Sequence, residues 1–163
     1  MLTHLRRAIL NRAGIAVALA LTLAACARTP DANLSGDQPA PGSTQEFVVS
    51  VGDRVLFDVN SSSINASGQS TLARQAQWLN QYQRYQVTIE GHADERGTRQ
   101  YNLGLGARRA EAVKTFLVAQ GVAPTRVRTI SYGKERPVEV CNEERCWSQN
   151  RRGVTVLSGG AGS

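Results

Sequence analysis

The chain has 163 residues, and its formal net charge of +6 comes partly from Arg6, Arg7 and Arg12, which lie in a first stretch of 25 residues without any acid. Without that stretch, 138 residues and a charge of +3 remain, enough for one domain with a packed core. The remainder holds no basic run and no basic residues interleaved with aromatic ones, which argues against a nucleic-acid partner.

The first 26 residues have the pattern of an export signal. Their arginines precede an apolar stretch that starts at residues 15–21 and is shorter than the roughly 20 residues of a transmembrane helix. It ends at Leu23-Ala24-Ala25-Cys26, a lipobox, which predicts that residues 1–25 are removed and that acylated Cys26 anchors the protein in a membrane. An ordinary signal with a chance cysteine is the alternative. Ala27, following the cysteine, favours the outer membrane.

Residues 26–46 have the composition of a flexible linker. They hold three of the chain's five prolines and almost no large apolar residue, and they show no period. Residues 158–163, rich in glycine and serine, predict a disordered tail. The folded domain is therefore expected over residues 47–157, held away from the membrane by the linker.

Strands and helices alternate along the expected domain. The predicted strands are 46–50 (a short edge strand), 55–59, 86–92, 127–132 and 153–157, and the predicted helices run from a cap at Asn65 to near Tyr82 and from Arg99 to Gln120. This β-α-β-α-β-β order implies right-handed crossovers. The sequence thus predicts an α+β fold, a two-layer sandwich with a mixed sheet and both helices on one face.

The helix over residues 99–120 has clear ends and one misplaced charge. Thr98 suits the N-cap position and Gly121 the C′ position. Helical steps from Arg109 reach apolar or small residues, whereas Arg108 has mixed polar neighbours; the former are Leu105, Gly106, Val113 and Phe116. The pattern predicts that Arg109 is buried and that Arg108 is solvated.

A buried guanidinium needs a carboxylate partner, and Asp94, in the charged loop before the helix, is the candidate. The unpaired N–H groups at the start of that helix would also favour an anion. Two interpretations stay open. Asp94 and Arg109 form a plain ion pair that pins the loop to the helix, or they form a binding site for a ligand that carries both charges.

Two cysteines remain once Cys26 is assigned to the lipid. In an oxidising compartment Cys141 and Cys146 are expected to form a disulfide that closes a short loop. A zinc site is the alternative, but His4 is lost with the signal, His92 is the only other histidine, and no second cysteine pair follows. No metal site is expected.

The sequence gives little support for an enzyme. His92, Asp94 and Glu95 lie close together, but the chain contains no nucleophile-elbow motif, no zinc-protease motif and no phosphate-binding loop. We expect neither catalysis nor a cofactor, and interpret His92 as a strand-end residue at the pocket floor.

Several segments together resemble the OmpA-like C-terminal domain family, over about residues 47–157. These segments are 91–98, 101–103, 105–110, 131–137 and 150–152. The resemblance implies an OmpA-like fold that binds the peptide stem of peptidoglycan non-covalently, through diaminopimelate. It implies that Asp94 accepts hydrogen bonds from the ammonium group of diaminopimelate and that Arg109 donates to the carboxylate on the same carbon.

The resemblance also suggests further site residues. Phe57 and Asp58 match a Phe-Asp pair of the family and would wall the pocket, while Thr98 and Leu105 would face the same crossover. Phe57 is equally consistent with a core position, and Thr98 with a helix cap alone.

Three features mark the limits of the resemblance. Asn150 and Arg151 match a family motif that we interpret as structural. Asn60 stands where a second acidic residue often lies. The pair formed by Cys141 and Cys146 is not general in the family.

Together with the lipobox, the resemblance implies a lipid-anchored protein that joins the outer membrane to the cell wall and serves the Tol system in envelope integrity and cell division. Its expected partners are peptidoglycan, the membrane and a periplasmic protein like TolB. A wall-binding lipoprotein with a signalling or stator-type task is the alternative. A stator subunit would need a transmembrane helix, whose place the lipobox takes.

Overall fold

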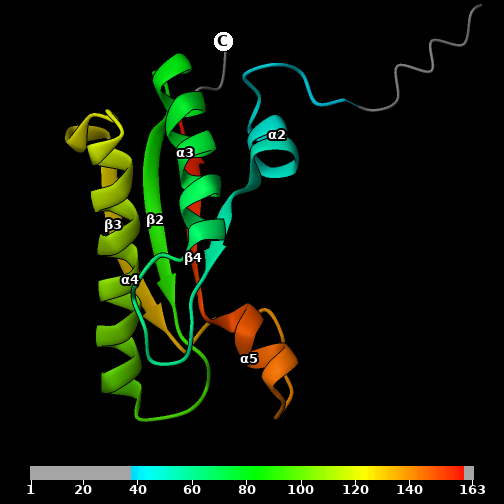
Figure 1. Ribbon diagram of the computed structural model, residues 1–163, viewed down its shortest axis with the longest axis vertical. Helices are drawn as coiled ribbons and strands as arrows, with labels where there is room; N and C mark the ends of the chain where they lie inside the picture. The colour runs from blue at the N-terminus through cyan, green and yellow to red at the C-terminus, as the bar shows by residue number, and fades with distance from the viewer. Residues whose placement is uncertain (1–37, 160–163) are drawn as a thin grey trace, which may run out of the picture. The chain divides into compact units, whose positions relative to one another are not determined.

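The apolar alternation of residues 86–92 produces the inner strand β2 (Gln86–His92), in which Val87 and Ile89 point into the core. The computed structural model describes residues 38–159. In it, a four-stranded sheet has the order β1-β4-β2-β3 (Figure 1). The other strands are β1 (Arg54–Leu56), β3 (Val127–Gly133) and β4 (Arg152–Ser158). β2 runs parallel to β3, and β4 runs antiparallel to β1 and β2, so the predicted mixed sheet is confirmed.

Two long helices, α3 (Ala66–Gln81) and α4 (Arg99–Ala119), cover one face of this sheet, as predicted (Figure 1). Asn65 caps the first helix, and the hydroxyl of Thr98 caps the second by accepting from the N–H of Tyr101 at 3.2 Å. The core between helices and sheet contains mainly aliphatic and aromatic side chains. Its largest fully buried apolar members are Phe47, Leu72, Leu79, Val87, Ile89, Val113, Leu117 and Val122.

The strand predicted at residues 46–50 is wrong. This segment forms the short helix α2 (Thr44–Glu46) and a π-helical turn, η2 (Phe47–Gly52). Phe47 and Val51 contact the core, but Val49 between them is 68% exposed, whereas a strand would place all three side chains on one face. Phe47 packs against Trp78 with ring centroids 4.9 Å apart.

The packed region extends N-terminally to Gly42. Its carbonyl oxygen accepts from the hydroxyl of Tyr85 at 2.7 Å, and Glu46 accepts from the indole N–H of Trp78 at 2.8 Å. The predicted signal, the lipidation site Cys26, most of the predicted linker and the last four residues of the tail lie outside the described residues. Within residues 38–159, no helix is both long and apolar enough to cross a membrane.

Strand β1 is shorter than predicted, because the chain turns after Phe57. Asn60 has a positive φ of 54°, and the N–H of Ser61 donates to the carbonyl of Asp58 at 3.2 Å. Residues 57–61 therefore form a loop beside the end of β2 instead of continuing the strand. This loop becomes one wall of the candidate site.

A further short helix, α5 (Glu144–Asn150), precedes β4 and was not predicted. The disulfide between Cys141 and Cys146 ties the first turn of α5 to the segment before it, which confirms the predicted pairing. Asn150 holds that segment as well, since its side chain accepts from the N–H of Val138 at 2.8 Å and donates to the carbonyl of Glu139 at 2.7 Å. Helix α5 is thus fixed at the end of the sheet where β2 ends and β4 begins (Figure 1).

Candidate ligand-binding pocket

A pocket of about 330 Å³ lies where β2 ends, α4 begins and the loop 57–61 passes. Charged, polar and apolar side chains all border it. The lining residues are Val59, Asn60, Asp94, Arg96, Gly97, Tyr101, Asn102, Leu105 and Arg109. Three of the predicted site residues, Asp94, Leu105 and Arg109, therefore lie at one pocket.

Two glycines explain why Arg109 reaches this pocket. A Cβ atom at Gly91 would collide with the carbonyl oxygen of Gly106, so α4 crosses β2 in direct backbone contact. Arg109 follows Gly106 on α4, and long helical side chains point back toward the helix N-terminus. Its guanidinium consequently extends past Gly91 to the end of β2.

Arg109 is fully buried, as predicted, and its partners are backbone carbonyls. Nε donates to Ser61 at 2.8 Å, Nη1 to His92 at 2.9 Å and Nη2 to Asp58 at 3.0 Å. Its guanidinium carbon also lies 5.2 Å from the ring centroid of Phe57. Burial lowers the pKa of Arg109 to about 10, against the opposing field of Asp94. The side chain holds the loop 57–61 against the strand end.

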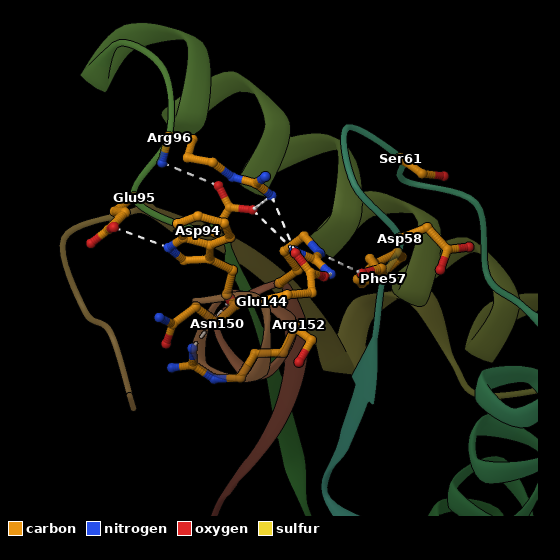
Figure 2. Close-up of polar contacts among 12 residues, drawn as sticks. Phe57, Asp58, Ser61, Asp94, Glu95, Arg96, Glu144, Asn150 and Arg152 are labelled. Carbon is orange, nitrogen blue, oxygen red and sulfur yellow. Dashed lines mark hydrogen bonds and ion pairs between the residues drawn. The ribbon is translucent and has the colours of Figure 1, made fainter. Parts of the chain in front are cut away.

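The plain ion pair between Asp94 and Arg109, left open by the sequence, is absent from residues 38–159. Asp94 instead accepts from Nη2 of Arg96 at 2.6 Å and from Nη1 of Arg151 at 3.2 Å (Figure 2). Burial alone would raise the pKa of Asp94, but hydrogen bonds from these two arginines outweigh it and hold the pKa below its ordinary value. Of the two interpretations, the plain ion pair is wrong, because Asp94 is bound by Arg96 and Arg151, and Arg109 by backbone carbonyls.

Arg151 lies behind the pocket lining, against Asp94, and the sequence pattern did not indicate this contact. It is 5% exposed, and besides Asp94 it donates to the carbonyl of Phe57 at 3.0 Å and to the carboxylate of Glu144. Its hydrogen bond lowers the pKa of Glu144. The sequence showed Arg151 in a family motif, but nothing in the spacing indicated that β4 lies beside β2, which is what brings it to Asp94.

The other predicted site residues lie around the pocket without lining it. Phe57 is 3% exposed and belongs to the core, and Thr98 caps α4. Asp58 has an exposed side chain and contributes its carbonyl to Arg109. His92 is buried, and neither of its ring nitrogens has a hydrogen-bond partner within residues 38–159.

The ring of His92 is held neutral by its surroundings. Burial, with the positive charges of Arg152 and Arg136, lowers the pKa of His92 to about 4, although Glu90 lies 3.5 Å from Nε2. Among the described residues no cluster of three or more His, Cys, Asp or Glu side chains is arranged to hold a metal ion.

Known proteins resemble this chain in sequence and in fold. The OmpA family matches residues 56–151. The peptidoglycan-associated lipoprotein of Mesorhizobium japonicum is 61% identical over 160 residues, which cover 94% of this chain and 95% of that protein. The crystal structure of the peptidoglycan-associated lipoprotein from Burkholderia pseudomallei has a TM-score of 0.65 at 39% identity, over 68% of this chain and 96% of that one. The C-terminal domain of Helicobacter pylori MotB, 24% identical over 67% of this chain and 86% of that chain, shares the fold with a TM-score of 0.63.

Proposed function

Because the chain belongs to the OmpA family and, within it, to the peptidoglycan-associated lipoproteins, we propose that it binds peptidoglycan non-covalently through diaminopimelate and tethers the outer membrane to the cell wall. The family supports a peptidoglycan-binding lipoprotein that is anchored in a membrane of the cell envelope. Diaminopimelate, the outer membrane and the Tol system are the finer parts of the proposal.

One observation carries the proposal. Asp94 and Arg109, of opposite charge, border the same pocket without bonding to each other. The free end of diaminopimelate carries an ammonium and a carboxylate on one carbon, so its two charges match the two side chains. If Asp94 and Arg109 paired with each other, fewer of their hydrogen-bonding groups would be available to such a ligand.

Each proposed contact has a physical basis in the pocket. Oδ1 of Asp94 accepts only one backbone N–H within residues 38–159, from Arg96 at 3.1 Å, which leaves it room to accept from an ammonium. Arg109 has five N–H groups, of which three are engaged with carbonyls. Leu105 supplies an apolar wall. When the ligand binds, the N–H groups of Arg109 that are not engaged with carbonyls would donate to its carboxylate.

Three further residues are proposed to shape the site from behind. The ring of Phe57 supports the guanidinium of Arg109, and the carbonyl of Asp58 fixes its orientation. Thr98, by capping α4, sets the helix start that carries Tyr101 into the pocket wall. Their replacement should weaken binding less than replacement of Asp94 or Arg109.

We propose that acylated Cys26 anchors the protein on the periplasmic face of the outer membrane and that residues 26–46 let the domain reach the wall. The proposed partners besides the wall are a periplasmic protein like TolB and other Tol components. No chemical reaction is proposed, since the pocket is suited to holding an ammonium and a carboxylate. Cys26→Ala should release the protein from the membrane fraction, and its persistence there would contradict the anchor.

Sedimentation with purified peptidoglycan tests the site. Asp94→Ala and Arg109→Lys should both abolish co-sedimentation. The first removes the negative charge that would bind the ammonium, and the second keeps the positive charge but loses the planar guanidinium that would bind the carboxylate. Arg108→Ala is the matched control: this exposed neighbour on α4 carries the same charge outside the pocket lining and should pellet as the wild type does. Wild-type sedimentation of both site variants, with their fold verified by circular dichroism, would refute the pocket assignment.

A further inference from the structure

The pocket is lined by two arginines whose donors are differently engaged. Arg109 is fully buried, and all three of its guanidinium nitrogens donate to backbone carbonyls. Arg96 has 40% of its side chain exposed and uses only Nη2 in a side-chain hydrogen bond, to Asp94 at 2.6 Å. Within residues 38–159, Nε and Nη1 of Arg96 have no acceptor. Arg96 is thus the guanidinium that offers unused donors at the pocket.

The position of Arg96 is fixed from α5. Its guanidinium carbon lies 4.2 Å from the ring centroid of Trp147, and Nη2 lies 4.0 Å from the carboxylate of Glu144. Trp147 is itself held by a hydrogen bond from its indole N–H to Glu95 at 3.0 Å. Figure 2 shows Arg96 extending alongside Asp94 toward Glu144. A guanidinium stacked in this way loses little rotamer freedom when it binds a ligand.

The charged side chains that line the pocket are mainly positive. They are the two arginines Arg96 and Arg109 and the carboxylate of Asp94, while Glu95 and Glu144 lie near Arg96 outside the lining. An anionic group of a ligand would be favoured by this lining, whereas a neutral group would not.

We propose that Arg96 binds the carboxylate of the ligand through its unused N–H groups and makes the site selective for a free carboxylate over a carboxamide, and that Trp147 is its positioning residue. The proposal rests on the proposed function, which supplies a ligand with that carboxylate. A carboxamide lacks the charge and replaces one of the two acceptor oxygens by an NH2 group, whose donors would face those of Arg96. Selectivity between these two forms is therefore the property that Arg96 controls.

Calorimetry with two soluble probes tests this assignment. The probes are a stem tripeptide ending in meso-diaminopimelate, and the same peptide amidated at the carboxyl group of the free end. Wild-type protein should prefer the free acid, and Arg96→Gln should weaken binding of the free acid by about tenfold or more and of the amide by less than about twofold. Trp147→Leu should shift the free acid in the same direction by a smaller factor.

Two controls separate charge and fold from contact. Arg99→Gln removes an equal charge next to the same loop, on a side chain that is 74% exposed and paired with Glu135, and it should change neither affinity. Arg96→Lys keeps the charge beside Asp94 but loses the planar fork, and should fall between wild type and Arg96→Gln for the free acid.

The outcomes distinguish this inference from the proposed function. Equal weakening of both probes by Arg96→Gln would assign Arg96 to holding Asp94 alone and overturn the inference, as would unchanged binding of the free acid. In both cases the wild type still binds and the proposed function stands. A wild type that binds neither probe, and does not sediment with peptidoglycan, would refute the proposed function and this inference with it.

Discussion

Two arginines near opposite ends of β2 each donate hydrogen bonds to three backbone carbonyls, yet only one of them borders the candidate site. Arg109 donates to three carbonyls near the end of β2, and Arg126 donates to those of Leu79, Tyr82 and Tyr85, before β2 begins. Burial lowers the pKa of both guanidinium groups. Each arginine thus holds a neighbouring segment in place: Arg109 holds the loop 57–61, and Arg126 holds residues 79–85.

The surroundings of the two arginines differ. Next to Arg126, the end of α3 carries an aromatic cluster in which Trp78 lies between Tyr82 and Tyr85, with ring centroids 4.6 and 5.2 Å from its own. Next to Arg109 lie a carboxylate, that of Asp94, and an open pocket. A buried arginine by itself therefore marks a backbone junction, and the carboxylate and the cavity are what make the other end a candidate binding site.

The largest expected effect is that of Arg109→Ala. It leaves three carbonyls without their donor in a buried place, so the free energy of unfolding should fall by about 3–5 kcal/mol, and binding to peptidoglycan should be lost. Urea unfolding measures the first and sedimentation the second. Arg108→Ala should change stability by less than about 0.5 kcal/mol. Equal stabilities of the two variants would show that Arg109 is not a junction residue.

Acid should lower the free energy of unfolding through the protonation of His92. Its pKa is near 4 in the folded protein against 6.5 when unfolded, so between these values the unfolded chain binds more protons. Stability is then complete above about pH 7 and falls by about 3 kcal/mol as the pH drops to about 4. In His92→Phe, the free energy of unfolding measured by urea should vary less with pH over this range. A slope that persists in this variant would place its origin elsewhere.

Removing the disulfide should loosen the pocket end alone. Replacing Cys141 and Cys146 together by alanine should lower the free energy of unfolding by about 2 kcal/mol, the value for closing so short a loop. Hydrogen exchange should quicken in α5 and leave the amides of α3 unchanged. Faster exchange throughout the domain would contradict a local role. The reduced wild type is the control and should match the variant.

The smallest expected effect is that of Arg126→Ala at the other end. Arg126 is partly exposed, so water can replace it at the carbonyls, and stability should fall by about 1 kcal/mol. Sedimentation with peptidoglycan should stay at the wild-type level. Loss of binding by this variant, with its fold intact, would remove the distinction between the two arginines.

Much of this fold could be predicted from local patterns. The strand 86–92 and the caps Asn65 and Thr98 follow from periodicity and from side-chain hydrogen bonding within a few residues, and all three were confirmed. The segment 46–50 failed because its valines suit a strand, while the packing of Phe47 against Trp78 favours a helical turn. Helix α5 is short and has no side-chain cap, so it left little local signal.

The site was predicted in part for the same reason. Periodicity identified Arg109 as buried, because the apolar face of a helix is a local property. Its partners could not be predicted, since two of the three carbonyls belong to the loop 57–61, about fifty residues away in the chain. Asp94 was likewise considered as a partner of Arg109, but it accepts from Arg96, two residues away, and from Arg151, 57 residues away.

The sequence by itself determined which residues form the long helices and the inner strand, that Arg109 is buried, and which cysteines pair. These properties depend on the residues' own spacing and chemistry. Only the tertiary structure decided that β4 lies beside β2, which brings Arg151 to Asp94 and leaves Arg109 to the backbone. A buried charge takes whichever partner the strand order brings within hydrogen-bonding distance, and that order is a property of the whole chain.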